Sequence, residues 1–242
     1  KNQMTPELVE FVAWVLSECA KIAKTIVIIG NHDFLENNNT RLDALTPIID
    51  SLKNENIVYL KNRGEYEDDN VDWVVYSLLD HNIPPEIEKT GRLKIGLFHG
   101  PVQGLTTDIG YKFETGFETD KFAGCDLVLC GDIHKRQEFS FKTGKGYMIG
   151  SPIQQNIGES RPLIQFNLPA THPKTNAMRP KFRVKSHTTL IRRRMFPTTV
   201  RAFPQIADFC AMNPYAFLVV VWPKVTMHQG FLQSQSQIRH ID

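Results

Sequence analysis

The sequence has 242 residues and a mass of 27.7 kDa, close to the largest size that a single hydrophobic core supports. Hydrophobic residues make up 41% and charged residues 22%, with a net charge of +2, so the composition excludes a wholly disordered chain. The apolar run at residues 216–222 is far shorter than the roughly 20 residues of a membrane-spanning helix. Four cysteines without C-x-x-C spacing, and no secretory signal, predict a cytoplasmic protein with reduced thiols and no membrane partner.

The first 160 residues predict alternating helices and strands. Thr5, Pro6 and Glu7 are typical of a helix start, because the hydroxyl can cap the helix, proline fits its first turn and an acid suits its positive end. Apolar residues then recur at helical spacing to about Ala23, and again over residues 42–52. Strands are expected at residues 25–29, 57–60, 71–79, 93–98 and 126–130, with a hairpin of 139–141 and 147–149 around residues 143–146. This order predicts an α/β fold, a sheet-based sandwich.

Charge is distributed unevenly along the chain. Residues 1–160 hold 16 basic and 24 acidic side chains, whereas residues 161–242 hold 12 basic and 2 acidic side chains and no glutamate. We therefore divide the chain into a domain of residues 1–160 and a basic tail of residues 161–242 of open structure. The tail is interpreted as a nucleic-acid-binding extension, a divergent and loosely folded segment, or the product of a shifted reading frame. Its apolar run at residues 217–222 predicts a buried strand and does not decide among the three.

A glycine-flanked polar group follows three of the predicted strands. The segments read G-N-H-D at residues 30–33, G-L-F-H-G at residues 96–100 and G-D-I-H at residues 131–134. Open α/β sheets bind ligands at the carboxyl ends of their strands, where residues far apart in sequence converge. Asp132 and His134 lie two residues apart, so an extended chain would point both side chains to one face. Because imidazole nitrogens and hard oxygens bind divalent metal ions, the three segments together predict a metal site.

These three segments, in this order, resemble the later motifs of the calcineurin-like metallophosphoesterases. Within that family they are most similar to the SbcD-type DNA repair nucleases, which include subunits of phage recombination endonucleases. Lys135-Arg136-Gln137 and the stretch G-S-P-I-Q-Q at residues 150–155 are also similar to segments of those nucleases. The resemblance covers about residues 5–160 and implies a metallophosphoesterase-type β-sandwich flanked by helices.

The resemblance implies a site for two divalent metal ions, with manganese expected and magnesium as the alternative. Asn31, His99 and Asp132 match ligands of the second ion, and His134 matches a ligand of the first. Asp132 departs from the commoner motif, which has histidine there; a carboxylate is a harder ligand and favours manganese or magnesium. Two ions about 3.5–4 Å apart would activate a water and stabilise the charge on the attacking and leaving oxygens.

The resemblance also implies residues that act on the substrate. His32 matches the histidine beside the scissile phosphate, which stabilises or protonates the leaving oxygen. Asp33 would hold the His32 ring in one tautomer and raise its basicity. Lys135 and Arg136 are expected to contact nucleic-acid phosphates. The expected reaction is the hydrolysis of phosphodiester bonds in DNA, by exonuclease or endonuclease activity in recombination or repair.

Two further motifs of the family, D-x-H and G-D-x-x-D, would precede the first predicted helix and do not occur there in this sequence. They would supply most ligands of the first ion and the carboxylate that bridges both ions. We therefore expect this chain to be an N-terminally truncated part of a nuclease that lacks activity alone. The missing strands would leave an unpaired sheet edge.

Two other functions remain open. A generic metallophosphoesterase would act on nucleotides or phosphoproteins, and a non-catalytic scaffold would bind DNA or a partner protein without metals. The nuclease interpretation implies DNA and an SbcC-type ATPase subunit as partners, with a homodimer as a further form. The intact histidines of the three segments argue against the scaffold, because loss of function usually erases such groups.

Overall fold

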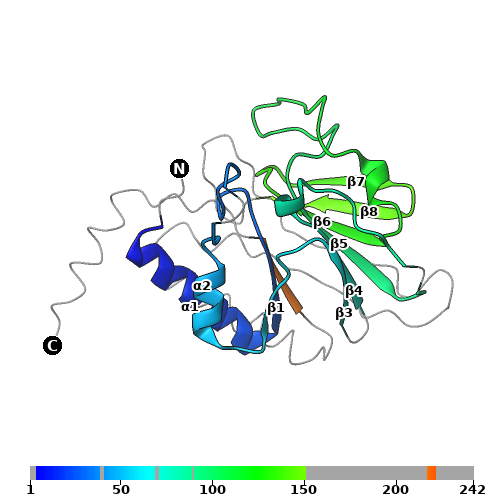
Figure 1. Ribbon diagram of the computed structural model, residues 1–242. Helices are drawn as coiled ribbons and strands as arrows, with labels where there is room; N and C mark the ends of the chain where they lie inside the picture. The colour runs from blue at the N-terminus through cyan, green and yellow to red at the C-terminus, as the bar shows by residue number, and fades with distance from the viewer. Residues whose placement is uncertain (1–3, 39–40, 69–70, 89, 151–216, 222–242) are drawn as a thin grey trace, which may run out of the picture.

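The computed structural model describes residues 4–38, 41–68, 71–88 and 90–150, together with the backbone of residues 217–221 (Figure 1). Within these ranges the chain forms two β-sheets, two α-helices and two short 3-10 helices. The helices are α1 (Pro6–Ile22), α2 (Thr46–Leu52), η1 (Leu78–Asp80) and η2 (Thr119–Phe122). The strands are β1 (Lys24–Ile28), β2 (Ile57–Tyr59), β3 (Gly64–Asp68), β4 (Val71–Tyr76), β5 (Leu93–His99), β6 (Leu127–Gly131), β7 (Gln137–Phe141), β8 (Gly144–Met148) and β9 (Phe217–Val221).

Helix α1 begins where the sequence predicts it, and α2 begins later. The hydroxyl of Thr5 accepts a hydrogen bond from the first turn of α1 at 3.3 Å, which caps this helix. Helix α2 was expected from residue 42 but begins at Thr46. The reason is that the buried carboxylate of Asp43 accepts a hydrogen bond from the Thr46 amide at 2.8 Å and holds the chain in a turn there.

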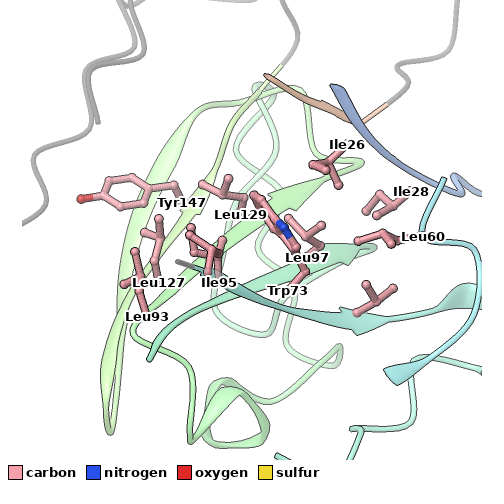
Figure 2. Close-up of a cluster of buried hydrophobic side chains, with 12 residues drawn as sticks. Ile26, Ile28, Leu60, Trp73, Leu93, Ile95, Leu97, Leu127, Leu129 and Tyr147 are labelled. Atoms are coloured by element: carbon pink, nitrogen blue, oxygen red, sulfur yellow. The ribbon is translucent and has the colours of Figure 1, made fainter. Parts of the chain in front are cut away.

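The two sheets pack face to face as a sandwich. The parallel sheet has the order β2-β1-β9, and the mixed sheet has the order β3-β4-β5-β6-β8-β7. Figure 2 shows Ile26 and Ile28 of β1 in one core with Trp73 and Leu97 of the mixed sheet. Val27 points the other way, into a second core with residues of α1 and α2, because side chains alternate along a strand. The predicted α/β class is confirmed.

An aromatic cluster covers the outer face of the mixed sheet. It consists of Tyr76 on β4, Phe98 on β5, and Phe117 and Phe122 from the segment that follows β5, with ring centroids 4.6–6.4 Å apart. Such rings bury a large apolar area in a defined geometry. They therefore hold the segment after β5 against the sheet, next to the carboxyl end of that strand.

Three strands differ from the prediction. Strand β3 was not predicted, because it is a charged edge strand without an apolar alternation, and it pairs only with β4. Strand β4 ends three residues early, because the Ser77 hydroxyl accepts a hydrogen bond from the turn η1. The predicted hairpin is present, but β8 already begins at Gly144, so the turn has two residues. The ring of Phe139 lies over Gly146, where a side chain would collide with it.

Strand β9 comes from the segment that the sequence assigns to the tail. The expected strand is present, and it pairs in parallel with β1, with Lys24 opposite Phe217 and Ile28 opposite Val221. Strand β1 therefore has neighbours on both sides and is not the unpaired edge that the missing upstream strands were expected to leave. The rest of the tail, and residues 151–155 of the G-S-P-I-Q-Q stretch, lie outside the described residues. No helix in the described part of the chain has the length and apolar character needed to cross a bilayer.

Candidate metal centre

The carboxyl ends of β1, β5 and β6 meet on one side of the sandwich. Strands β5 and β6 are parallel neighbours with His99 opposite Gly131, so Asp132 follows beside His99. Asn31 lies three residues after β1, in the loop of the other sheet, and its amide reaches His99. The structure thus brings together one residue from each of the three predicted strand-end segments.

Three polar side chains define the centre of this site, and the distances among them are short. His99 Nε2 lies 3.2 Å from Asn31 Oδ1 and 3.8 Å from Asp132 Oδ1. Asn31 Nδ2 donates a long hydrogen bond of 3.4 Å to Asp132 Oδ1. The amide of Asn31 therefore bridges the imidazole and the carboxylate. We call Asn31, His99 and Asp132 the metal-centre triad.

The triad fits one hard divalent cation. Ligands of an octahedral ion with bonds of about 2.1 Å lie about 3 Å apart when adjacent and about 4.2 Å apart when opposite. The 3.2 Å distance from His99 Nε2 to Asn31 Oδ1 is close to the adjacent spacing, and the 3.8 Å distance to Asp132 Oδ1 lies between the two spacings. Two hard oxygens with one imidazole nitrogen suit manganese or magnesium, as the sequence analysis expected from the carboxylate at Asp132. The donor set and its spacing are therefore compatible with a bound ion.

His99 is held in the form that a metal ligand needs. Its side chain is buried, and burial lowers the pKa of His99 to about 4; the carboxylate of Asp132 opposes this shift and His32 adds to it. The ring is therefore neutral at physiological pH, and one of its two nitrogens, which one depending on the tautomer, carries a lone pair. Its Nδ1 atom is buried and makes no hydrogen bond to the described residues. An orphaned ring nitrogen in a buried site is uncommon and marks this position as one under functional constraint.

The backbone at Asp132 departs from the geometry assumed in the sequence analysis. Its φ angle is 97°, in a region that glycine favours and other residues avoid. The chain is therefore not extended at this residue, and the argument that placed Asp132 and His134 on one face does not hold. His134 is half-buried, and its role as a ligand of another ion stays a prediction. Strained backbone of this kind concentrates at functional sites.

Gly30 and Asp33 form the floor of the loop that carries Asn31. A Cβ atom on Gly30 would lie 3.2 Å from Asp33 Oδ2 and 3.4 Å from His99 Cε1, so glycine allows both groups to approach the backbone. The Gly30 amide donates to Asp33 Oδ2 at 2.8 Å. Burial raises the pKa of Asp33 to about 7; the Gly30 amide opposes the shift and the nearby carboxylate of Asp43 adds to it. That Asp33 also orients the ring of His32 stays a prediction.

The remaining predicted residues lie beside the triad. His32 is exposed and close enough to His99 to affect its pKa, which is compatible with contact to a substrate. Lys135 donates from Nζ to the Thr106 hydroxyl at 2.9 Å, and Arg136 is half-buried next to it. Lys135 thereby fixes the segment after His134 to the loop after β5. Contacts of Lys135 and Arg136 with nucleic acid remain predicted.

The fit of one metal ion at the triad does not provide ligands for a second ion. In the described part of the chain, no three or more His, Cys, Asp and Glu side chains form a group that could hold a metal ion. The triad has only two members of these types, because its third is an amide. The expected second ion has only His134 among the residues matched here, so a pair of ions stays a prediction.

The sequence analysis missed one residue that lies against the triad. Asn82 donates from Nδ2 to the backbone oxygen of His99 at 3.5 Å, and its buried Oδ1 has no hydrogen-bond partner among the residues described. It follows β4, a parallel neighbour of β5. Asn82 lies three residues after the expected end of this strand at residue 79, and the sequence analysis passed over it because no glycine flanks it.

Comparisons with known proteins place few limits on the function. No protein-family model matches the chain. The chain is 34% identical over 172 residues to the uncharacterized protein R555 of Acanthamoeba polyphaga mimivirus. The alignment takes in 66% of this chain but 13% of the mimivirus protein, so the chain corresponds to a small part of that relative.

Proposed function

We propose that the chain is the metal-binding part of a phosphoesterase that hydrolyses phosphodiester bonds in DNA, in the manner of the SbcD-type nucleases. The observation that carries the proposal is the metal-centre triad, in which His99 Nε2 lies 3.2 Å from Asn31 Oδ1 and 3.8 Å from Asp132 Oδ1. Asn31, His99 and Asp132 lie at the carboxyl ends of β1, β5 and β6, and these strands belong to two sheets. Their convergence supports a common ligand better than three separate structural roles.

Each residue has a part in this proposal. A divalent ion at the triad would supply Lewis-acid stabilisation of the phosphate charge. Asn31, His99 and Asp132 would hold the ion, and the neutral ring of His99 can do so because burial lowers its pKa to about 4. The exposed ring of His32 would stabilise or protonate the leaving oxygen. Asp33 would act beneath it as a positioning residue, through the loop that it closes with the Gly30 amide.

The loop after β5 supports a nucleic-acid substrate. Lys135 Nζ donates to the Thr106 hydroxyl at 2.9 Å. The side-chain oxygen of Gln137 accepts from the Thr106 amide at 2.8 Å, and its side-chain nitrogen donates to the Thr106 carbonyl at 2.7 Å, so the K-R-Q segment anchors the loop after β5. The tip of this loop exposes Ile109, which is 91% exposed, and Tyr111, which is 60% exposed, next to Lys112. An aromatic ring beside a lysine suits unpaired bases and their phosphates.

The proposal is tested by titrating the chain with Mn²⁺ in a calorimeter. We expect binding of about one ion, with affinity reduced at least about tenfold by Asn31→Ala or Asp132→Asn, because each removes a ligand. The matched control is Asp120→Asn, which removes an exposed carboxylate of η2 that is not part of the triad and should leave binding unchanged. No binding by the wild type, or equal binding by Asn31→Ala, would contradict the proposal.

DNA binding separates the nuclease from the two alternatives. The metal-loaded chain should bind a duplex with a single-stranded overhang, more weakly as salt rises, because phosphate contacts release counterions. A generic phosphoesterase would bind Mn²⁺ but show no preference for DNA. A scaffold would bind DNA equally well with and without Mn²⁺.

A further inference from the structure

A buried ion pair lies below the loop that carries Asn31. Asp43 is 3% exposed, and its carboxylate forms an ion pair with Lys61 Nζ at 2.6 Å. It also accepts hydrogen bonds from the hydroxyl of Thr46 at 2.6 Å and from the Thr46 amide at 2.8 Å. The next residue, Ala44, donates its amide to the backbone oxygen of Asp33 at 2.7 Å. The ion pair therefore fixes the point at which the Asn31 loop is tied down.

The backbone of Lys61 continues this path toward His99. Its carbonyl oxygen accepts a hydrogen bond from the hydroxyl of buried Ser77 at 2.7 Å. The backbone oxygen of Ser77 accepts from the Asn82 amide at 2.9 Å. Asn82 Nδ2 then donates to the backbone oxygen of His99 at 3.5 Å. An unbroken series of hydrogen bonds and one ion pair thus joins the Asn31 loop, in one sheet, to His99, in the other.

Three features indicate that this path is maintained at a cost. Asn82 and His81 both adopt positive φ angles, 56° and 52°, which side chains other than asparagine and glycine rarely favour. The buried Oδ1 of Asn82 makes no hydrogen bond within the described ranges. Burial would raise the pKa of Asp43, but its bonds to Lys61 and Thr46 hold that pKa below its usual value. A buried charge pair of this kind tolerates the loss of neither partner.

We propose that Lys61 is a positioning residue that sets the distance between the Asn31 loop and His99 in the metal-centre triad. Its side chain holds the Asn31 loop through Asp43, and its backbone holds His99 through Ser77 and Asn82. The consequence for metal affinity rests on the proposed function, whereas the link between the Asn31 loop and His99 does not require a metal.

The link is tested first without metal. In Lys61→Met, hydrogen exchange should become faster in residues 30–33, and the side-chain amide resonance of Asn31 should shift. The matched control is Lys24→Met, which breaks the ion pair with Asp68 at 2.5 Å on a strand that also contributes to the site. Lys24 lies at the opposite end of β1, so this control should lower stability without either change. Ser77→Ala should produce the same shifts from the other side of Lys61, and Lys61→Arg should restore the wild-type spectrum.

The second readout is Mn²⁺ affinity, which should fall about tenfold in Lys61→Met, the lower end of the effect of residues that orient metal ligands. The double variant with Ser77→Ala should bind no more weakly than the weaker single variant, because both interrupt one path. If the wild type binds Mn²⁺ but Lys61→Met behaves like Lys24→Met in both readouts, the inference is overturned and the proposed function stands. If the wild type binds no Mn²⁺ but Lys61→Met still shifts the Asn31 amide, the inference stands and the proposed function fails. Should Lys61→Met not fold, Ser77→Ala decides by the same readouts.

Discussion

Replacing Asp132 by glycine should make the protein more stable while removing its metal site. A residue other than glycine at a φ of 97° carries strain of about 1–3 kcal/mol, which glycine relieves. Glycine also gives the unfolded chain more conformational freedom, which lowers the gain in stability by about 0.4–1 kcal/mol. The side chain of Asp132 is 29% exposed, and its contacts at 3.4 and 3.8 Å are long, so little else is lost. The net gain is about 1 kcal/mol in the free energy of unfolding.

The assays are urea denaturation and thermal denaturation, both followed by fluorescence, with Mn²⁺ titration of the same samples. A gain of about 1 kcal/mol should raise the melting temperature by about 2–4 °C in a chain of this size. The control is Asp120→Gly, at an exposed position with negative φ, which should lose about 0.5–1 kcal/mol. If Asp132→Gly destabilises the protein as much as Asp120→Gly does, then Asp132 is not strained and the functional reading of its backbone is wrong.

Four further predictions concern pH, packing and DNA. In the wild type, the pKa of Asp33 is raised from 3.8 to about 7, so this group stabilises the fold at low pH and the stabilisation is lost as pH increases. Asp33→Asn removes this loss, so between pH 4 and 7 its unfolding free energy should rise more steeply with pH than that of the wild type. His99→Asn should do the opposite in urea titrations at pH 4.5, 5.5 and 6.5, because the pKa of His99, lowered from 6.5 to about 4, gives stability that is lost as pH falls. Gly30→Ala should weaken Mn²⁺ binding about tenfold with a smaller effect on stability, since its Cβ would press on Asp33 and His99; unchanged calorimetric affinity would refute this. Tyr111→Ala should weaken binding to a single-stranded overhang by about 1–3 kcal/mol in an anisotropy titration, whereas Leu42→Ala, at another exposed apolar residue, should not. Equal effects of the two variants would show that the loop tip at Tyr111 does not contact DNA.

The sequence predicts the site by the position of polar residues after strands. This works for His99 and Asp132, because β5 and β6 are parallel neighbours whose carboxyl ends share one edge. Asn31 follows a strand of the other sheet and meets them only through the packing of the two sheets, which the sequence does not predict. The same logic gives the α/β class and most of the strands. It fails for β3, whose charged residues carry no apolar alternation, although the strand is held by its pairing with β4.

What the sequence does not predict is the geometry within the site. The positive φ of Asp132 depends on how the loop is held after β6, and a two-residue spacing cannot reveal it. The path through Lys61 and Ser77 relies on backbone carbonyls, which every residue has, so no side-chain pattern marks it. The ion pair of Asp43 with Lys61 joins residues 18 apart, and the sequence analysis placed Asp43 in the helix expected over residues 42–52, where its turn and its partner could not be foreseen.

The central claim is that three distant loops hold one divalent ion, and Mn²⁺ broadening of nuclear magnetic resonance signals tests it most directly. Paramagnetic Mn²⁺ added at less than one equivalent should broaden the signals of Asn31, His99 and Asp132 first and together. Broadening that begins elsewhere, for example at the acidic strand β3, or none at one equivalent, would contradict the claim.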